Sequence, residues 1–245
     1  MLYANQELHQ NLETYLSFDD IRQDRRFDRP FRPTFYSNVD FVDGRHKALV
    51  TDPTNPETHM IDIGIDGWLL PADAGKLYEL AMFSVGPILE IGTFKGLSTS
   101  IIAESVHNSK RPRQIVTVDL SPANISQAAI GMGERATPGR QNVHFYVNEG
   151  AAFLRFAAQQ KMNFGFAFID HSHRFEHVKS VVEELPTVLA PGAFVVFHDY
   201  NDPRNPSERD QNFGVYQALD QSAATSDLEF WGIFGCCGLF RFVPK

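Results

Sequence analysis

Acidic and histidine side chains follow a series of short apolar segments, and this repetition is the main sign of chemistry in the sequence. The residues concerned are Glu90, Asp119, Glu149, Asp170 with His171 and His173, and His198 with Asp199. In open α/β sheets, ligands bind at the carboxyl ends of the strands. If the apolar segments are parallel strands of one sheet, these side chains meet at one edge and form a single site.

Asp170 and Asp199 are the pair best suited to a metal ion, because the segments that they follow are expected to be neighbours in the sheet. Two carboxylates that lie close together raise each other's pKa unless a cation separates them. Oxygen ligands suit Mg²⁺, Ca²⁺ or Mn²⁺, whereas participation of His198 or His171 would also allow Mn²⁺, Fe²⁺ or Zn²⁺. We therefore predict a divalent metal site at Asp170, Asp199 and His198.

A turn with glycine at both ends indicates a cofactor site. Residues 88–91 have the pattern of a buried strand, Gly92 and Gly96 enclose the turn, and apolar residues from Leu97 onward have helical spacing. Glycine lets the backbone approach a ligand, and a helix N-terminus offers free N–H groups. The G-x-G-x-x-G triplet is absent, which disfavours a nicotinamide cofactor. An ordinary strand-to-helix turn is the structural alternative.

Asp119 lies at the expected tip of the strand after this turn. A carboxylate in that position can accept hydrogen bonds from both hydroxyls of a ribose. The alternative is that it caps the next helix, although Ser121 could do so instead.

The pattern between these residues predicts an α/β fold. Strand and helix patterns alternate, as in a Rossmann-like, doubly wound, mostly parallel seven-stranded sheet with an antiparallel strand at its C-terminal end. The expected strands are residues 88–91, 115–120, 143–148, 164–170, 193–199, 228–235 and 236–243. The expected helices are residues 71–83, 97–106, 122–136 (a weaker helix, broken by Gly131 and Gly133), 151–160, 175–189 and 214–223. We assign residues 67–245 to this domain.

Residues 1–66 differ in pattern from the rest of the chain and are assigned to an N-terminal extension. Residues 7–18 fit a short helix, and residues 36–58 have the proline and aspartate content of a loop. Arginines and aspartates alternate between them, which indicates a solvated face rather than an anion site. The extension is expected to pack on the domain, cover the active site or mediate a homodimer.

Composition restricts the partners and the location of the protein. The 245-residue chain is 43% hydrophobic and has a formal net charge of -8, which argues against nucleic acid as the main partner. It has neither an apolar run long enough to span a bilayer nor a secretory leader, so no membrane partner is expected. Its 2 cysteines, Cys236 and Cys237, are adjacent, so they form no disulfide framework and indicate a cytoplasmic protein. They are expected to lie in a strand as small hydrophobic residues.

The motif Glu90-x-Gly92-x-x-x-Gly96 resembles the first motif of the class I S-adenosylmethionine (SAM) dependent methyltransferases, and Asp119 matches their second motif. Residues 168–179 and 189–200 resemble one subgroup, the metal-dependent O-methyltransferases of sugars and other small hydroxylated molecules. The resemblance covers roughly residues 67–243. It implies SAM as cofactor, a small-molecule acceptor and methyl transfer to a hydroxyl group.

The resemblance also implies roles for individual residues. The cofactor-binding residues would be Glu90, Gly92, Thr93, Gly96, Ser98, Asp119, Glu149 (near adenine) and Asp170. Asp170 and Asp199 would hold a divalent cation such as Mg²⁺, which lowers the pKa of the acceptor hydroxyl, and His173 would remove the proton, with Asp170 part of the catalytic pair. The chain departs from the subgroup at His198, where metal-binding members often have an acid. It also lacks the lysine base and the Asp-Asn pair of the catechol-type relatives.

Two other classes of function stay open. A metal-dependent hydrolase could use Asp170, His171, His173, His198 and Asp199 to activate water, but it leaves the glycine turn and Asp119 unexplained. A methyltransferase-like partner subunit without catalysis is the other alternative. His171 and His173 could instead cap or flank the following helix, and His177 is expected to be structural.

Overall fold

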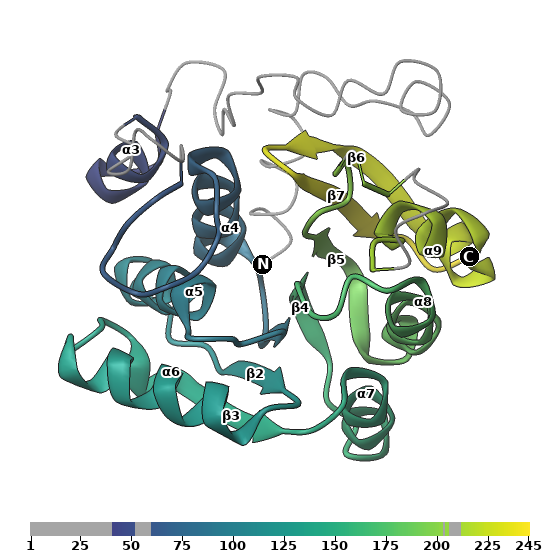
Figure 1. Ribbon diagram of the computed structural model, residues 1–245, viewed down its shortest axis with the longest axis horizontal. Coiled ribbons are helices and arrows are strands. Elements are labelled where there is room, and N and C mark those ends of the chain that lie inside the picture. Colours follow the sequence, from purple (N-terminus) through teal and green to yellow (C-terminus); the bar gives the residue numbers. More distant parts are fainter. Residues whose placement is uncertain (1–40, 52–59, 203, 206–211) are drawn as a thin grey trace.

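A seven-stranded sheet with helices on both faces forms the core of the computed structural model, which describes residues 41–51, 60–202, 204–205 and 212–245 (Figure 1). The strand order is β3-β2-β1-β4-β5-β7-β6. The strands are β1 (Ile88–Ile91), β2 (Ile115–Asp119), β3 (Val143–Val147), β4 (Phe164–Ile169), β5 (Leu189–Phe197), β6 (Leu228–Phe234) and β7 (Cys237–Phe242). Strands β1 to β5 pair in parallel, and β7 is antiparallel to both β5 and β6. The predicted fold class is confirmed.

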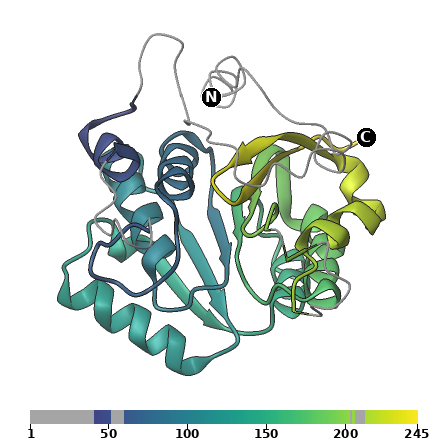
Figure 2. The ribbon, with the colours of Figure 1, turned by 45° about the horizontal axis from the view of Figure 1, so that its top comes forward.

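The helices are divided between the two faces of this sheet. They are α3 (Gly44–Thr51), α4 (Pro71–Phe83), α5 (Leu97–Asn108), α6 (Pro122–Glu134), α7 (Gly150–Gln159), α8 (Phe175–Glu184) and α9 (Val215–Gln221). Ile88 of β1 packs with α4 and α5, whereas Leu89 and Ile91 pack with α7 and α8. Burial on both faces explains why β1 and β4 are continuously apolar in sequence. Figure 2 shows the two groups of helices on opposite sides of the strands.

The direction of the strand order reverses between β1 and β4. From β1 the chain winds outward through β2 and β3, and it then returns to β4 and winds outward the other way. Such a reversal leaves a crevice at the carboxyl ends of the two central strands, where α/β proteins bind their ligands. The predicted site residues follow these same strand ends.

Several expected boundaries were wrong. Helix α3 lies in the region predicted to be loop, and α6 continues through Gly131 and Gly133 because Ala128 and Met132 pack into the core. Helix α8 ends at Glu184 and a 3₁₀ helix, Leu185–Val188, follows it. Strand β5 begins at Leu189, four residues earlier than predicted, and it includes Pro191 and Gly192. The helix predicted at residues 7–18 lies outside the described residues.

A buried group of charged side chains joins α3 to α4. His46 Nε2 lies 2.9 Å from Glu79 Oε1, and Lys76 pairs with the other oxygen of the same carboxylate. The Tyr78 hydroxyl donates a hydrogen bond of 2.6 Å to Asp43 Oδ2. Part of the region before residue 67 thus packs on the domain, while the boundary itself stays a prediction. Among the described residues, we find no helix with the length and apolar character that a bilayer crossing requires.

Candidate active site

A cavity of about 950 Å³ lies at the carboxyl ends of the central strands. Its lining includes Gly92 and Thr93 from the glycine turn and Ser98 from the start of α5, together with Asp119, Glu149, Asp170, His173, His198 and Asp199. The structure therefore brings most of the predicted site residues to one cavity. Glu90 and Gly96 do not line it.

The glycine turn has a backbone that requires glycine at both ends. Gly92 has φ 107° and Gly96 has φ 88°, in the left-handed region that side chains disfavour. A Cβ on Gly92 would overlap the backbone carbonyl of Asp170, and a Cβ on Gly96 would press on Ala128 of α6. Gly92 thus allows the loops after β1 and β4 to meet, whereas Gly96 allows α5 and α6 to pack.

Glu90 is buried behind the glycine turn and does not face the cavity. Its buried carboxylate accepts hydrogen bonds from the hydroxyls of Ser98 (2.5 Å), Thr99 (2.5 Å) and Thr117 (2.6 Å). Burial raises its pKa to about 7, although these three hydrogen bonds oppose the shift. Glu90 therefore contacts the start of α5 and not the cavity, and its predicted part in cofactor binding stays a prediction.

The raised pKa of Glu90 predicts a pH dependence of stability. Between its ordinary pKa of 4.5 and about 7, the folded protein keeps a proton that the unfolded chain has lost. The contribution of Glu90 is therefore complete below pH 4.5 and disappears as the pH rises through 7. We expect the free energy of unfolding to fall by about 3 kcal/mol over this range in the wild type relative to Glu90→Gln. Urea unfolding of both proteins from pH 5 to 8 measures this difference, and parallel pH profiles would contradict the assignment.

Asp119 links the glycine turn to the start of α6 beside the cavity. Its Oδ2 accepts a hydrogen bond of 2.9 Å from the Phe94 N–H, and its Oδ1 accepts from Ser121 N (2.8 Å) and Asn124 Nδ2 (3.1 Å). Ser121 is the N-cap of α6 and accepts a hydrogen bond from Asn124 N, as the sequence suggested. The Asp119 carboxylate is thus held in one orientation where the turn and α6 meet.

Glu149 has a structural role that the sequence did not indicate. It is the N-cap of α7, and its carboxylate accepts hydrogen bonds from Ala151 N (3.0 Å) and Ala152 N (2.8 Å). It lines the cavity, so a contact with adenine stays a prediction.

Two carboxylates and two imidazoles form a compact cluster at the ends of β4 and β5. His173 Nε2 lies 2.9 Å from Asp199 Oδ2 and 3.5 Å from Asp170 Oδ1. His198 Nδ1 lies 3.2 Å from the same Asp170 oxygen and 3.6 Å from Asp199 Oδ2. We call these four residues the Asp–His cluster. It contains all three predicted metal ligands and the predicted base.

The Asp–His cluster stabilises its own charged forms. Burial opposes the charge of each group, but the hydrogen bonds with Asp170 and Asp199 outweigh burial at His173 and raise its pKa to about 9. Burial would raise the pKa of Asp170. The charge of His198 and the hydrogen bond between Asp170 and His173 outweigh burial and lower this pKa to about 2. The pKa of Asp199 is lowered and that of His198 raised by these same pairings, again against the effect of burial.

Two residues that the sequence did not single out position His173. The rings of His173 and Phe213 are stacked, with centroids 5.1 Å apart and planes at 1°. The guanidinium carbon of Arg204 lies 3.6 Å from the centroid of Phe213, and Arg204 pairs with Asp202. Phe213, Arg204 and Asp202 all follow β5 in the sequence and line the cavity.

The neighbouring histidines have separate surroundings. Burial lowers the pKa of His171 to about 4, and its Nε2 lies 3.4 Å from the carbonyl oxygen of His177. His177 Nδ1 lies 2.8 Å from the hydroxyl of Ser172. Both contacts lie within the loop after β4 and the first turn of α8. Neither imidazole belongs to the Asp–His cluster.

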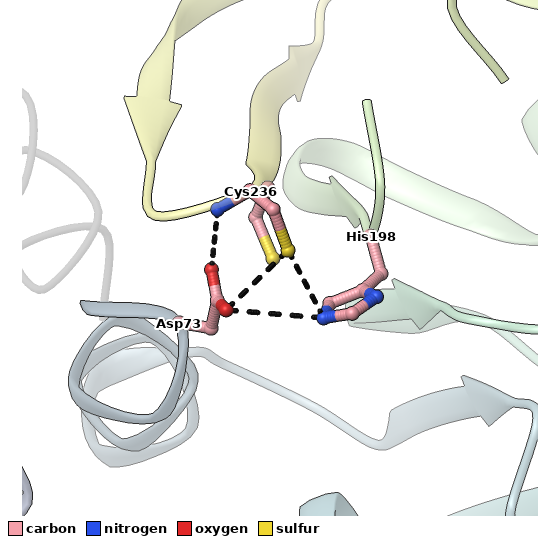
Figure 3. A group of neighbouring side chains, drawn as sticks. Asp73, His198 and Cys236 are labelled. Carbon is pink, nitrogen blue, oxygen red and sulfur yellow. Dashed lines mark hydrogen bonds and ion pairs between the residues drawn. The ribbon is translucent and has the colours of Figure 1, made fainter. Parts of the chain in front are cut away.

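Asp73 and Cys236 also lie at the site, although no motif in the sequence indicated that they belong to it. Asp73 lies in the first turn of α4, and Cys236 lies in the turn between β6 and β7 (Figure 3). The prediction that both cysteines lie in a strand was correct only for Cys237. The thiol of Cys236 is 3.2 Å from His198 Nε2 and 3.4 Å from Asp73 Oδ2.

Comparison with known proteins agrees with this geometry. Residues 89–200 match the family model of a methyltransferase domain, and no curated protein matches the chain. Among solved structures, an O-methyltransferase from Bacillus cereus bound to S-adenosylhomocysteine (SAH) has a TM-score of 0.58 at 20% identity, covering 74% of this chain and 84% of its own.

Two further structures come from natural-product pathways. The O-methyltransferase TomG of tomaymycin synthesis from Streptomyces achromogenes, bound to SAM, has a TM-score of 0.57 at 19% identity, covering 82% of this chain and 91% of its own. CalS11, a TDP-rhamnose 3'-O-methyltransferase of calicheamicin biosynthesis, has a TM-score of 0.54 at 18% identity, covering 69% of this chain and 76% of its own. At these identities the structures establish a shared fold.

Residues 89–200 match a methyltransferase domain, and the sheet order and the glycine turn agree with that match. The chain is accordingly a SAM-dependent methyltransferase, and the predicted enzyme class and organic cofactor are confirmed.

Proposed function

We propose that this enzyme transfers the methyl group of SAM to a hydroxyl group of a small molecule, with the help of a divalent cation at the Asp–His cluster. The observation that supports this most directly is the position of His173. Its Nε2 lies 2.9 Å from Asp199 and 3.5 Å from Asp170, on the lining of the cavity that also contains the glycine turn. A proton acceptor, two anionic oxygen ligands and the cofactor loop thus share one space.

SAM would lie along the carboxyl ends of β1 and β2. Gly92, Thr93, Ser98 and Asp119 line the cavity there, and the Asp119 carboxylate would accept hydrogen bonds from the ribose hydroxyls. Hydrogen bonds from Phe94 and Ser121 already fix the orientation of Asp119, which reduces the entropy lost on binding. Glu149 lines the same space from the end of β3.

The Asp–His cluster has a suitable set of donors for the cation. Asp170 and Asp199 offer carboxylate oxygens, and His198 Nδ1 faces both of them. Oxygen-rich sets of this kind bind Mg²⁺ or Mn²⁺. When bound, such a cation supplies positive charge that lowers the pKa of a nearby hydroxyl group.

His173 would take the proton from the acceptor hydroxyl through Nε2. The two carboxylates stabilise the imidazolium form, so the proton is held once it has been transferred. Positive charge bound to the carboxylates reduces their pull on that proton and increases the neutral, basic fraction of His173 at pH 7. The stacked ring of Phe213 keeps the imidazole in the orientation that this transfer requires.

A small acceptor fits both the cavity and the charge of the chain. The net charge of -8 does not favour a nucleic acid, and the structural neighbours include enzymes named for small-molecule methylation. TDP-rhamnose, the substrate class named for CalS11, is a reasonable first acceptor to test. A cytoplasmic location and a homodimer stay predictions of the sequence.

Calorimetric titration with SAH, with and without Mg²⁺ or Mn²⁺, tests the cofactor and the cation together. We expect binding in both conditions and tighter binding with the ion. Asp199→Asn removes one anionic ligand, so it should abolish the effect of the ion while SAH still binds. Asp227→Asn, a matched change just before β6, should behave like the wild type. If Asp199→Asn still shows the full effect of the ion, the cation site is placed wrongly.

A further inference from the structure

Four potential metal ligands meet at the floor of the active-site cavity, on the side of His198 that faces away from the Asp–His cluster. They are the carboxylate of Asp73, Nε2 of His198 and the thiols of Cys236 and Cys237. One ligand atom from each residue lies within 4.8 Å of every other. We infer that these four residues bind one thiophilic divalent metal ion, of which Zn²⁺ is the representative.

The distances fit a single ion. Tetrahedral zinc with bonds of about 2.0–2.3 Å places neighbouring ligand atoms about 3.3–3.8 Å apart. Cys236 Sγ is 3.2 Å from His198 Nε2 and 3.4 Å from Asp73 Oδ2, and the last two atoms are 3.8 Å apart. Shifts of a few tenths of an ångström would therefore bring these three atoms to the spacing of zinc ligands, and the Cys237 thiol lies within 4.8 Å of each of them.

His198 has the orientation of a histidine that is bound to zinc. Its Nδ1 lies 3.2 Å from Asp170 Oδ1, and its Nε2 points toward Asp73 and Cys236. Metal-bound histidines usually donate their other ring N–H to a carboxylate, which fixes the tautomer. With Nε2 on the metal, Nδ1 keeps its proton, and His198 contacts the Asp–His cluster as a hydrogen-bond donor instead of a ligand of its cation.

The backbone places the other ligands before any ion arrives. Asp73 accepts hydrogen bonds from Leu70 N (2.8 Å, to Oδ2) and Cys236 N (2.9 Å, to Oδ1). Gly235 has φ 60°, and a Cβ at this residue would overlap Asp73 Oδ1. This left-handed turn allows Cys236 to face Asp73 (Figure 3). The thiol of the adjacent Cys237 supplies the fourth potential ligand.

The surroundings favour an ion that binds firmly but takes no direct part in chemistry. Asp73 is completely buried, Cys237 is 1% exposed and His198 is 6% exposed. Four protein ligands leave no open position, as in structural zinc sites. The ion would join α4, the end of β5 and the β6–β7 turn beneath the Asp–His cluster. Asp73, His198 and Cys236 line the cavity, which gives the ion a path of entry.

The test uses the full chain, stripped of metal with a chelator and kept reduced. We expect it to bind one equivalent of Zn²⁺ in competition with a chromophoric chelator, and Co²⁺ to produce a thiolate-to-cobalt charge-transfer band. Cys236→Ser should reduce the intensity of that band, because only the Cys237 thiolate remains, and should weaken Zn²⁺ binding about 100-fold or more, since loss of a single outer-shell partner already costs 10- to 100-fold. Circular dichroism without metal would verify that this variant is folded.

The zinc site shares His198 with the Asp–His cluster and would leave Asp170 and Asp199 as the ligands of the proposed catalytic cation, but its test is separable. Asp199→Asn, which removes a ligand of that cation, should retain the cobalt band, and Cys236→Ser should still bind SAH. A wild-type protein with no thiolate band, or equal Zn²⁺ affinity in Cys236→Ser, would overturn the inference. Weak binding of Zn²⁺ at several equivalents, without a thiolate band, would also overturn it.

Discussion

Replacing His173 by glutamine is expected to lower kcat for methyl transfer by about 10²- to 10⁴-fold, the usual contribution of a positioned general base. Glutamine has a similar length and can contact Asp199, but its amide cannot take a proton from the acceptor. The affinity for SAH should change by less than about threefold, because His173 lies at the end of β4 and does not touch the glycine turn. The rate of SAH release, with an acceptor that the wild type methylates, provides kcat.

A control distinguishes the loss of the base from a general effect of losing a histidine. His144→Gln makes the same change on the exposed surface of β3 and should leave kcat and SAH affinity unchanged. If His173→Gln retains kcat within about threefold, the acceptor loses its proton to another group and the role assigned to His173 is wrong. A parallel loss of SAH affinity would instead indicate that the loop after β4 has changed its structure.

The central strands were predictable because burial on both faces makes their sequences continuously apolar. Strand β1 has the predicted bounds, Ile88–Ile91. Helix α3 was missed for the opposite reason. It is 8 residues long and has little amphipathic pattern, and the contact of His46 with Glu79 of α4 holds it in place. A short helix that depends on a tertiary contact leaves no periodic signal in its own sequence.

The site could be predicted where it follows the topology of the sheet. Asp119, Asp170 and Asp199 follow parallel strands, so their convergence follows once those strands are recognised. Contacts between the site and distant parts of the chain were not predictable in this way. Cys236 contacts Asp73 across 163 residues of sequence, and Phe213 reaches His173 from the segment after β5. Such contacts depend on how helices and turns pack, which no local spacing encodes.

Glu90 shows that the residues of one sequence motif can have different surroundings in the structure. Its spacing to Gly92 and Gly96 marks the cofactor turn, which suggested contact with SAM. In the structure its carboxylate is buried under the turn and accepts hydrogen bonds from Ser98, Thr99 and Thr117. The motif therefore combines residues that line the cavity with one that fixes their backbone.

Asp119→Ala is expected to weaken SAH binding by at least about 100-fold. Two hydrogen bonds from ribose hydroxyls to a carboxylate would be lost, and hydrogen bonds to charged groups contribute about 1.5–3 kcal/mol each. The same change leaves the Phe94 N–H without its 2.9 Å acceptor, which loosens the turn. Asp119→Asn keeps an oxygen that can accept from Phe94 but removes the charge, so its loss of affinity should be intermediate. Calorimetric titration with SAH measures all three proteins.

Comparison with a distant acidic residue separates the ribose contact from the overall charge of the enzyme. Glu134→Ala removes an exposed carboxylate at the end of α6 and should bind SAH like the wild type. Thermal unfolding distinguishes a binding defect from a folding defect, because Asp119 also links the turn to Ser121 and Asn124. If Asp119→Ala binds SAH with wild-type affinity, the carboxylate serves only those loop contacts and the ribose must be bound elsewhere. If affinity falls while the midpoint of unfolding stays well above the titration temperature, the carboxylate at the tip of β2 binds the cofactor directly.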